Sequence, residues 1–163
     1  MTTTTRTFLL NQLGEMSEFL EKSFRGLSRD LLLRTPATDN LSLLEHLWHV
    51  RDCESELYTP WIVGVLTEER CRLMPVAIDG WPSERRYDLR DGDQAIREFG
   101  ELRRDLIARL QATSDESFLR TGLVRDDREV GVYRLIEQLI EHDRDHRWRM
   151  CALLRECAER PVV

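Results

Sequence analysis

The sequence lacks the features that would place the protein in a membrane, outside the cell or on a nucleic acid. No apolar run reaches the ~20 residues that a membrane-spanning helix needs. The N-terminal stretch MTTTTRTFLL has no basic segment followed by an apolar one, as a signal peptide would. The net charge of −6 argues against binding to nucleic acids, because that affinity depends on neutralising phosphates. We therefore expect a cytoplasmic protein that contacts neither membranes nor nucleic acids.

Paired cysteines are also lacking. The four cysteines form no C-x-x-C motif, and a chain of 163 residues without a secretion signal is not expected to carry a disulfide framework. Apolar residues make up 41% of the chain and charged residues 33%, which is typical of a globular protein rather than a disordered one. The length suits a single domain over residues 1–163, and we expect residues 1–6 to be flexible.

Convincing β-strands are absent too, and apolar residues instead recur at helical spacing. The pattern predicts four long helices, over residues 7–27, 40–58, 94–111 and 132–156. Residues 72–91, between the second and the third of these, contain two prolines and a glycine and are predicted to form a long connection. A four-helix bundle accommodates a crossover of this kind. We therefore predict an all-α fold, a four-helix bundle with a long crossover connection.

The ends of the second helix carry one clear signal and one ambiguity. Ser42 and Glu45 form an S-x-x-E capping box, which satisfies free amide groups of the first helical turn. Pro60 either ends this helix or opens a further turn, in which case the apolar stretch WIVGVL extends the helix. Residues 120–131 are predicted to form a loop that holds a short turn or two extended pieces.

Two of the four histidines, His142 and His146, lie on the apolar seam of the last helix. At this spacing their Cβ atoms are ~5–6 Å apart on one helix face, and two such imidazoles can bind one metal ion. The alternative is a structural polar pair, because each ring needs a partner inside a core. Both interpretations fit the pair alone. The charged residues between them are predicted mostly on the outer face, although Asp143 could hydrogen-bond to a metal-bound ring.

The other two histidines, His46 and His49, lie on the second helix. Helical spacing puts His49 on a narrow polar strip, which either faces solvent or lines a polar pocket between helices. Two known metal motifs do not fit the chain. H-E-x-x-H needs a glutamate at the position of Asp143, and the di-iron bundles need E-x-x-H on two helices.

Taken together, four stretches make the chain resemble the DinB-like superfamily of metal-binding four-helix bundles. They are LSLLEHLWHVRDCE, DGWPSERRYDLRD, EFGELRRDLIARL and RTGLVRDDREVGVYRLIEQLIEHDRDH, and they lie within residues 40–155. The resemblance implies a three-histidine site formed by His49, His142 and His146, with His46 as a neighbour. It implies a divalent metal ion, nickel or zinc, and homodimers are common in the family. Some members are S-transferases or isomerases that use a low-molecular-weight thiol such as bacillithiol, mycothiol or glutathione.

Two hypotheses about function follow from the resemblance. The first is a metal-dependent transferase of the low-molecular-weight thiol type, or a hydrolase, that acts on a small-molecule thiol or electrophile. The second is a non-catalytic metal- or ligand-binding bundle, a stress-associated dimer. A degenerate family member without metal is a further case.

The resemblance also suggests roles for residues around the three histidines. Asp52 or Glu45 could orient His49, and Cys53 could add a soft fourth ligand. Arginines suit the carboxylates of a thiol cofactor, and the candidates are Arg51, Arg103 and Arg144.

Overall fold

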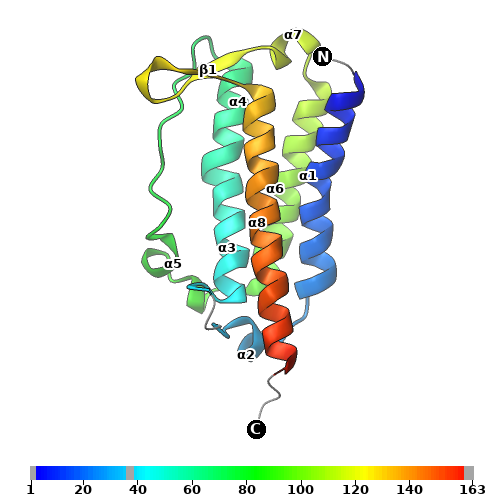
Figure 1. Cartoon of the computed structure of the whole chain (residues 1–163), viewed down its shortest axis with the longest axis vertical. Helices are drawn as coiled ribbons and strands as arrows, with labels where there is room; N and C mark the ends of the chain where they lie inside the picture. Colours follow the sequence, from blue (N-terminus) through cyan, green and yellow to red (C-terminus); the bar gives the residue numbers. More distant parts are fainter. Residues whose placement is uncertain (1–2, 36–38, 160–163) are drawn as a thin grey trace.

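Four long helical segments lie side by side in the computed structural model, which describes residues 3–35 and 39–159 (Figure 1). They are α1 (Thr3–Phe24); α3 (Leu43–Cys53), continued by η1 (Glu54–Tyr58) and α4 (Thr59–Thr67); α6 (Gly92–Ala112); and α8 (Val132–Glu159). The predicted all-α four-helix bundle is therefore confirmed. Within the described residues, no helix is both long enough and apolar enough to cross a membrane.

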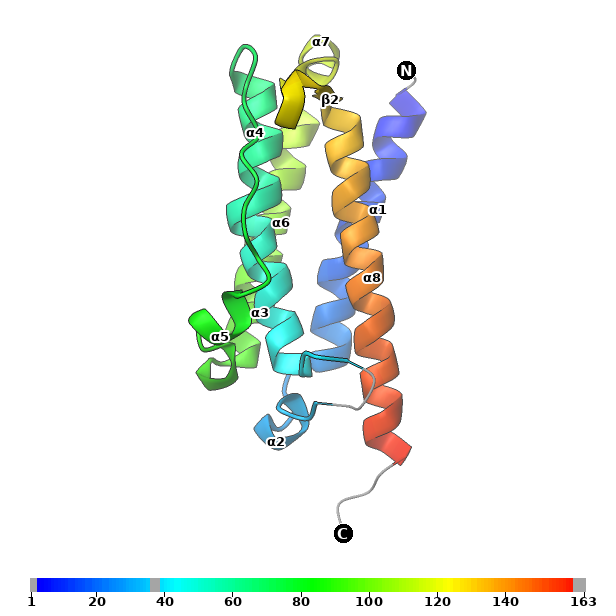
Figure 2. The ribbon, with the colours of Figure 1, turned by 60° about the vertical axis from the view of Figure 1, so that its left-hand side comes forward.

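The helices follow a down-up-up-down order (Figures 1 and 2). After α1 descends and α3–α4 rises, residues 68–91 return along the outside of the bundle as the crossover, so that α6 rises parallel to α3–α4. The crossover carries two short helices, α5 (Trp81–Glu84) and η2 (Tyr87–Leu89). Each long helix contacts two others: α1 and α3 both pack against α6 and α8. The predicted long crossover is thus present, and it leaves α3 and α8 in direct contact.

The remaining elements cap the two ends of the bundle. Helix α2 (Arg29–Leu32) lies at one end, and α7 (Asp115–Phe118) lies at the other. Beside α7, strands β1 (Thr121–Leu123) and β2 (Glu129–Gly131) pair in antiparallel fashion around η3 (Arg125–Asp127). The interpretation of residues 120–131 as a loop with two extended pieces is confirmed.

The second helix keeps its predicted cap and continues past Pro60. The Ser42 and Glu45 backbone amides each donate a hydrogen bond to the other residue's side chain, at 2.8 and 3.3 Å, so the capping box is present. The π-helical turn η1 follows α3 directly, and Pro60 falls in the first turn of α4. A proline inside a helix removes one amide donor and crowds the carbonyl four residues earlier. The wider π turn relieves this crowding, and the chain remains one continuous helix.

The first helix is displaced toward the N-terminus relative to the prediction. It begins at Thr3 and ends at Phe24, where Gly26 adopts a φ of +74° that stops helix propagation. Of residues 1–6, which we expected to be flexible, residues 3–6 are helical and residues 1–2 lie outside the described part. Arg6 donates to the backbone oxygens of Leu110 and Thr113 at the end of α6, which ties this first turn to the bundle.

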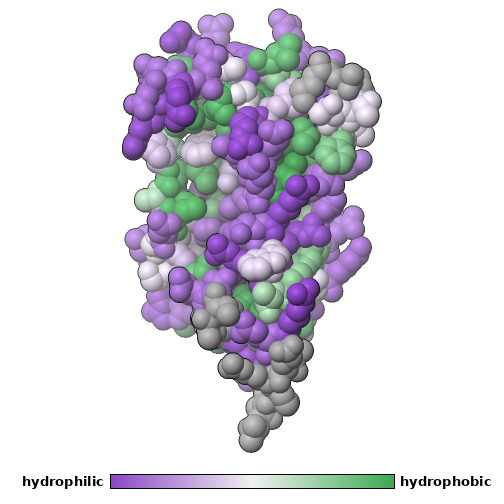
Figure 3. Space-filling model, viewed as in Figure 1, coloured by the Kyte–Doolittle hydropathy of each residue, from purple (hydrophilic) through white to green (hydrophobic). Residues whose placement is uncertain are grey.

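The buried core consists of two apolar clusters. The lower cluster, near α2 and α5, includes Phe24, Leu47, Phe99 and Met150. The upper cluster, near α7, includes Leu13, Ile62, Leu106 and Leu139. Between them lies a polar layer of fully or largely buried residues, made of His46, His49, Glu54, Arg103, Asp143 and His146. Hydrophilic side chains cover most of the face shown in Figure 3. The polar residues of this layer instead lie inside the bundle, where burial costs free energy unless each polar group has a partner.

Candidate metal centre

All four histidines meet where α3 crosses α8. The ring centroids of His142 and His146 are 4.5 Å apart, those of His49 and His146 4.8 Å, and those of His49 and His142 5.7 Å. His46 joins the group from the other side of His146, at 5.0 Å. The structure therefore brings His49, His142 and His146 together, although His49 and His142 are distant in the sequence.

Several ring nitrogens in this group are buried without hydrogen-bond partners. Nδ1 of His49 and both nitrogens of His142 have no partner. Leaving a buried polar atom unpaired costs about 1–3 kcal/mol, so native structures rarely do so without a ligand or water. Ligand atoms of His49, Cys53 and His142 lie within 4.8 Å of one another, and Cys53 Sγ is 3.5 Å from His49 Nε2. These three residues form a group that could hold a metal ion.

His146 lies against this group but points one nitrogen away from it. Its Nδ1 is 2.8 Å from Nδ1 of His46, whose Nε2 is in turn 3.2 Å from the Asp39 carboxylate. His146 therefore belongs to the ring cluster by packing, while the mutually close ligand atoms are those of His49, Cys53 and His142.

Burial keeps the rings of His49 and His146 neutral, which is the form that binds metal ions. Burial, reinforced by the neighbouring His142, lowers the pKa of His49 to about 4. The same two causes lower the pKa of His146 further. Burial, together with Asp52, raises the pKa of the Cys53 thiol to about 12, so this thiol is protonated at neutral pH unless a cation lowers its pKa. The donor set present at pH 7 thus fits a divalent metal ion.

The sequence model of the DinB superfamily matches residues 12–150, a range that includes all four histidines. The chain belongs to the DinB superfamily. No curated protein matches it. Among solved structures, it is similar to YfiT from Bacillus subtilis, which is described as a probable metal-dependent hydrolase with an unusual four-helix bundle topology. The match has a TM-score of 0.85 and 18% sequence identity, and it covers 97% of this chain and 90% of YfiT. At this identity, the likeness shows a shared fold.

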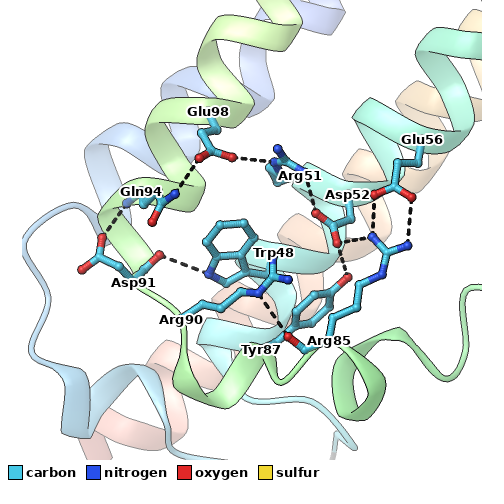
Figure 4. Close-up of polar contacts among 10 residues, drawn as sticks. All are labelled: Trp48, Arg51, Asp52, Glu56, Arg85, Tyr87, Arg90, Asp91, Gln94 and Glu98. Atoms are coloured by element: carbon cyan, nitrogen blue, oxygen red, sulfur yellow. Dashed lines mark hydrogen bonds and ion pairs between the residues drawn. The ribbon is translucent and has the colours of Figure 1, made fainter.

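In this DinB-superfamily bundle, the two acids expected to orient His49 have other partners, and Figure 4 shows those of Asp52. The buried Asp52 carboxylate accepts hydrogen bonds from Arg51 at 2.9 Å, Arg85 at 2.6 Å and Tyr87 at 2.8 Å. The Glu45 carboxylate is occupied in the capping box. Neither acid orients His49, because Nδ1 of that ring has no hydrogen-bond partner and its Nε2 contacts Cys53 Sγ.

Asp52 instead fastens the crossover to α3. Arg85 comes from the end of α5 and Tyr87 from η2, so together with Asp52 they form a crossover latch. Arg85 also pairs with Glu56 at 2.5 and 2.8 Å and lies over the Trp81 ring at 3.8 Å. Figure 4 shows Arg85 and Tyr87 of the crossover reaching Asp52, which follows His49 by three residues on α3.

A second group of charges adjoins His142. Arg103 of α6 is 1% exposed and donates to both oxygens of Glu54 at 2.8 Å and to Asp143 at 2.8 and 3.4 Å. It also donates to the Leu13 backbone oxygen at 2.6 Å, which links this buried ion-pair cluster of Glu54, Arg103 and Asp143 to α1. Arg103 is therefore not available to a cofactor carboxylate, contrary to one sequence-based suggestion.

For Asp143 the sequence left two places open, the solvent-facing side of α8 or a position beside a metal-binding histidine, and the structure has it on the inner side. It is buried, and its Oδ1 is 3.9 Å from Nδ1 of His142. Burial alone would raise the pKa of Asp143, but the Arg103 guanidinium outweighs burial and holds that pKa below its usual range. The neighbouring Asp145 and Arg144 are exposed, so the expected outer face holds for them.

The π turn supplies one residue of the centre that sequence reasoning missed. The Tyr58 ring is 5.2 Å from the His142 ring. Burial, with the nearby Cys53 and Asp143, raises the pKa of Tyr58 above its ordinary value, so its phenol is a hydrogen-bond donor at neutral pH. No sequence signal marks this residue, because its position depends on the non-standard geometry of η1.

Proposed function

We propose that the chain is a divalent-metal-dependent enzyme whose metal ligands are His49, His142 and His146. The proposal rests on one observation: buried, unpartnered imidazole nitrogens gather where α3 crosses α8. A bound cation would supply the partner that Nδ1 of His49 and one ring nitrogen of His142 lack. The description of YfiT as a probable metal-dependent hydrolase supports a hydrolytic role.

Three histidine ligands leave a coordination position for a reacting molecule. When bound there, a nickel or zinc ion would lower the pKa of a water or a thiol and so provide a nucleophile at neutral pH. The protein's own part is to hold neutral imidazoles in a water-poor layer and to present the Tyr58 phenol as a donor beside His142. Hydrolysis and transfer of a low-molecular-weight thiol to an electrophile both suit this arrangement.

Cys53 favours one alternative function. A structural metal site is closed by four protein ligands, whereas a catalytic site keeps a position open. Because ligand atoms of His49, Cys53 and His142 lie within 4.8 Å of one another, the thiol could complete a four-ligand set and block the open position. The alternative is therefore a non-catalytic metal-binding bundle, and removal of Cys53 separates it from the enzyme.

Metal analysis of untagged protein tests both candidates. We expect stoichiometric nickel or zinc in the wild type, a large loss in His142→Ala and His146→Ala, and no change in Asp145→Ala, an exposed control on the same helical turns. If Cys53→Ala keeps its metal, the thiol is not a required ligand and the enzyme is favoured; if it loses the metal, the closed site is favoured. Equally low metal in the wild type and His142→Ala would refute both.

The reaction is tested on the metal-loaded protein. One arm measures conjugation of bacillithiol, mycothiol or glutathione to a fluorogenic electrophile, and the other measures hydrolysis of activated esters and amides. We expect turnover in one arm that His142→Ala abolishes. Retained metal with no turnover in either arm would favour the non-catalytic bundle. The predicted homodimer is tested by light scattering on the same samples.

A further inference from the structure

His46 links the candidate metal centre to a carboxylate outside it. Nε2 of His46 is 3.2 Å from Oδ2 of Asp39, and its Nδ1 is 2.8 Å from Nδ1 of His146. His46 is completely buried between these two partners. Asp39 lies just before α3 and borders a surface hollow of about 310 Å³, where the Arg149 guanidinium is 4.0 Å from the same carboxylate oxygen. A continuous contact chain therefore runs from the surface to His146.

The chemistry of these groups assigns a hydrogen to each contact. An ionised carboxylate only accepts hydrogen bonds, so the contact with Asp39 requires a hydrogen on Nε2 of His46. A neutral imidazole carries one ring hydrogen, so Nδ1 of His46 is an acceptor. The contact of 2.8 Å then requires His146 to donate from its Nδ1. His146 is then left with a lone pair on its Nε2.

We propose that Asp39 and His46 fix His146 as its Nδ1–H tautomer and so make Nε2 the atom that ligates the metal. The inference rests on the proposed function, because it assigns the ligating atom of one of the three proposed ligands. In it, His46 is a positioning residue: it acts through His146 and holds the ring in place from the side opposite the metal. Partners of this kind typically change metal affinity by about 10–100-fold when they are removed.

The tautomers can be measured directly in the metal-free protein. Long-range ¹H–¹⁵N correlation spectra of protein labelled at histidine distinguish protonated from unprotonated ring nitrogens. We expect the hydrogen on Nε2 in His46 and on Nδ1 in His146, the two opposite tautomers. In His46→Phe, the preference of His146 for Nδ1–H should weaken. A hydrogen on Nε2 of His146, or on both nitrogens of His46, would overturn the inference whatever the metal does.

Metal affinity provides the second readout, by competition with a zinc chelator. His46→Phe keeps the volume but offers no acceptor, and we expect about 10–100-fold weaker zinc binding. His46→Asn places a carbonyl oxygen near the position of Nδ1 and should restore most of the affinity. Glu45→Ala, which removes the capping box in the same turn but no part of the chain from Asp39 to His146, should bind zinc like the wild type.

The outcomes separate the inference from the function. Unchanged zinc affinity in His46→Phe, together with loss in His142→Ala, would refute the positioning role and keep the metal centre. Equal weakening in His46→Phe, His46→Asn and Glu45→Ala would also refute it, because general destabilisation would then explain the effect. If the wild type binds no divalent ion, the proposed function fails, and the tautomers alone decide how Asp39 and His46 hold His146.

Discussion

Replacing Arg103 by leucine should destabilise the protein more than any exposed change on α6. The guanidinium is almost fully buried and makes four contacts of 2.8–3.4 Å with two carboxylates. In Arg103→Leu, Glu54 and Asp143 would remain buried without a counter-charge. Removing one member of a buried ion pair costs about 3–5 kcal/mol, and for a domain of this size each kcal/mol lowers Tm by about 2–4 °C. We therefore expect Tm to fall by roughly 10 °C.

Urea unfolding followed by far-UV circular dichroism measures the change in the free energy of unfolding. Arg104→Leu is the matched control, because Arg104 is the exposed neighbour on the same helix and should change stability by no more than about 0.5 kcal/mol. The triple variant with leucine at 54, 103 and 143 removes all three charges and should recover most of the loss. An Arg103→Leu protein within about 1 kcal/mol of the wild type would refute the interpretation of the ion-pair cluster.

The pH dependence of the wild type gives an independent check of the same cluster. The pKa of Asp143 is lower in the folded protein than its ordinary value, so the unfolded chain binds the proton more readily. Its contribution to the free energy of unfolding is therefore fully present above about pH 5 and is lost as the pH falls through the folded-state pKa. The deficit of Arg103→Leu relative to the wild type should shrink over the same acidic range.

Four further predictions follow from the structure. Asp52→Ala opens the crossover latch, and limited proteolysis should then cut within residues 68–80 faster than in the wild type; equal rates would contradict the latch. Cys53, with a pKa of about 12, should resist alkylation at pH 8 in the native protein and react on unfolding, and rapid native labelling would show that the thiol is accessible. Ser42→Ala should lower the free energy of unfolding by about 1 kcal/mol in urea titrations, whereas a value unchanged within error would show that the cap is dispensable. Zinc at about 100 times Kd should stabilise the wild type by about 2.7 kcal/mol in calorimetry but leave His142→Ala unaffected; equal shifts would place the ion elsewhere.

The sequence predicted those parts of the fold that depend on local patterns. The capping box at Ser42 and the placement of His142 and His146 on the inner seam of α8 follow from short-range spacing, and both are present. The predicted start of α1 is four residues late, because the threonine run is a weak helix former. The first turn is held instead by Arg6 of α1, which donates to the Thr113 backbone oxygen at the end of α6. A contact between residues about a hundred positions apart in the sequence produces no periodic pattern from which it could be predicted.

The candidate centre was predictable only in part. The resemblance to a family supplied His49, whereas periodicity alone left it on an ambiguous polar strip. Glu54 and Tyr58 could not be placed, because helical periodicity assumes about 100° per residue and the π turn departs from that value. Asp39 precedes the helix in irregular structure, so no pattern pointed to its contact with His46. Arg103 did leave a signal, a lone charge on the apolar stripe of α6 between Phe99 and Leu106.

The ion-pair cluster also bears on how the bundle folds. The partners of Arg103 lie 40, 49 and 90 residues away along the chain, on three other segments of the bundle. A half-assembled bundle would hold a guanidinium or a carboxylate in apolar surroundings without its partner, which is a high-energy arrangement. Partly folded forms are thereby disfavoured. The upper and lower apolar clusters, although separated by the polar layer, should therefore unfold together in one cooperative transition.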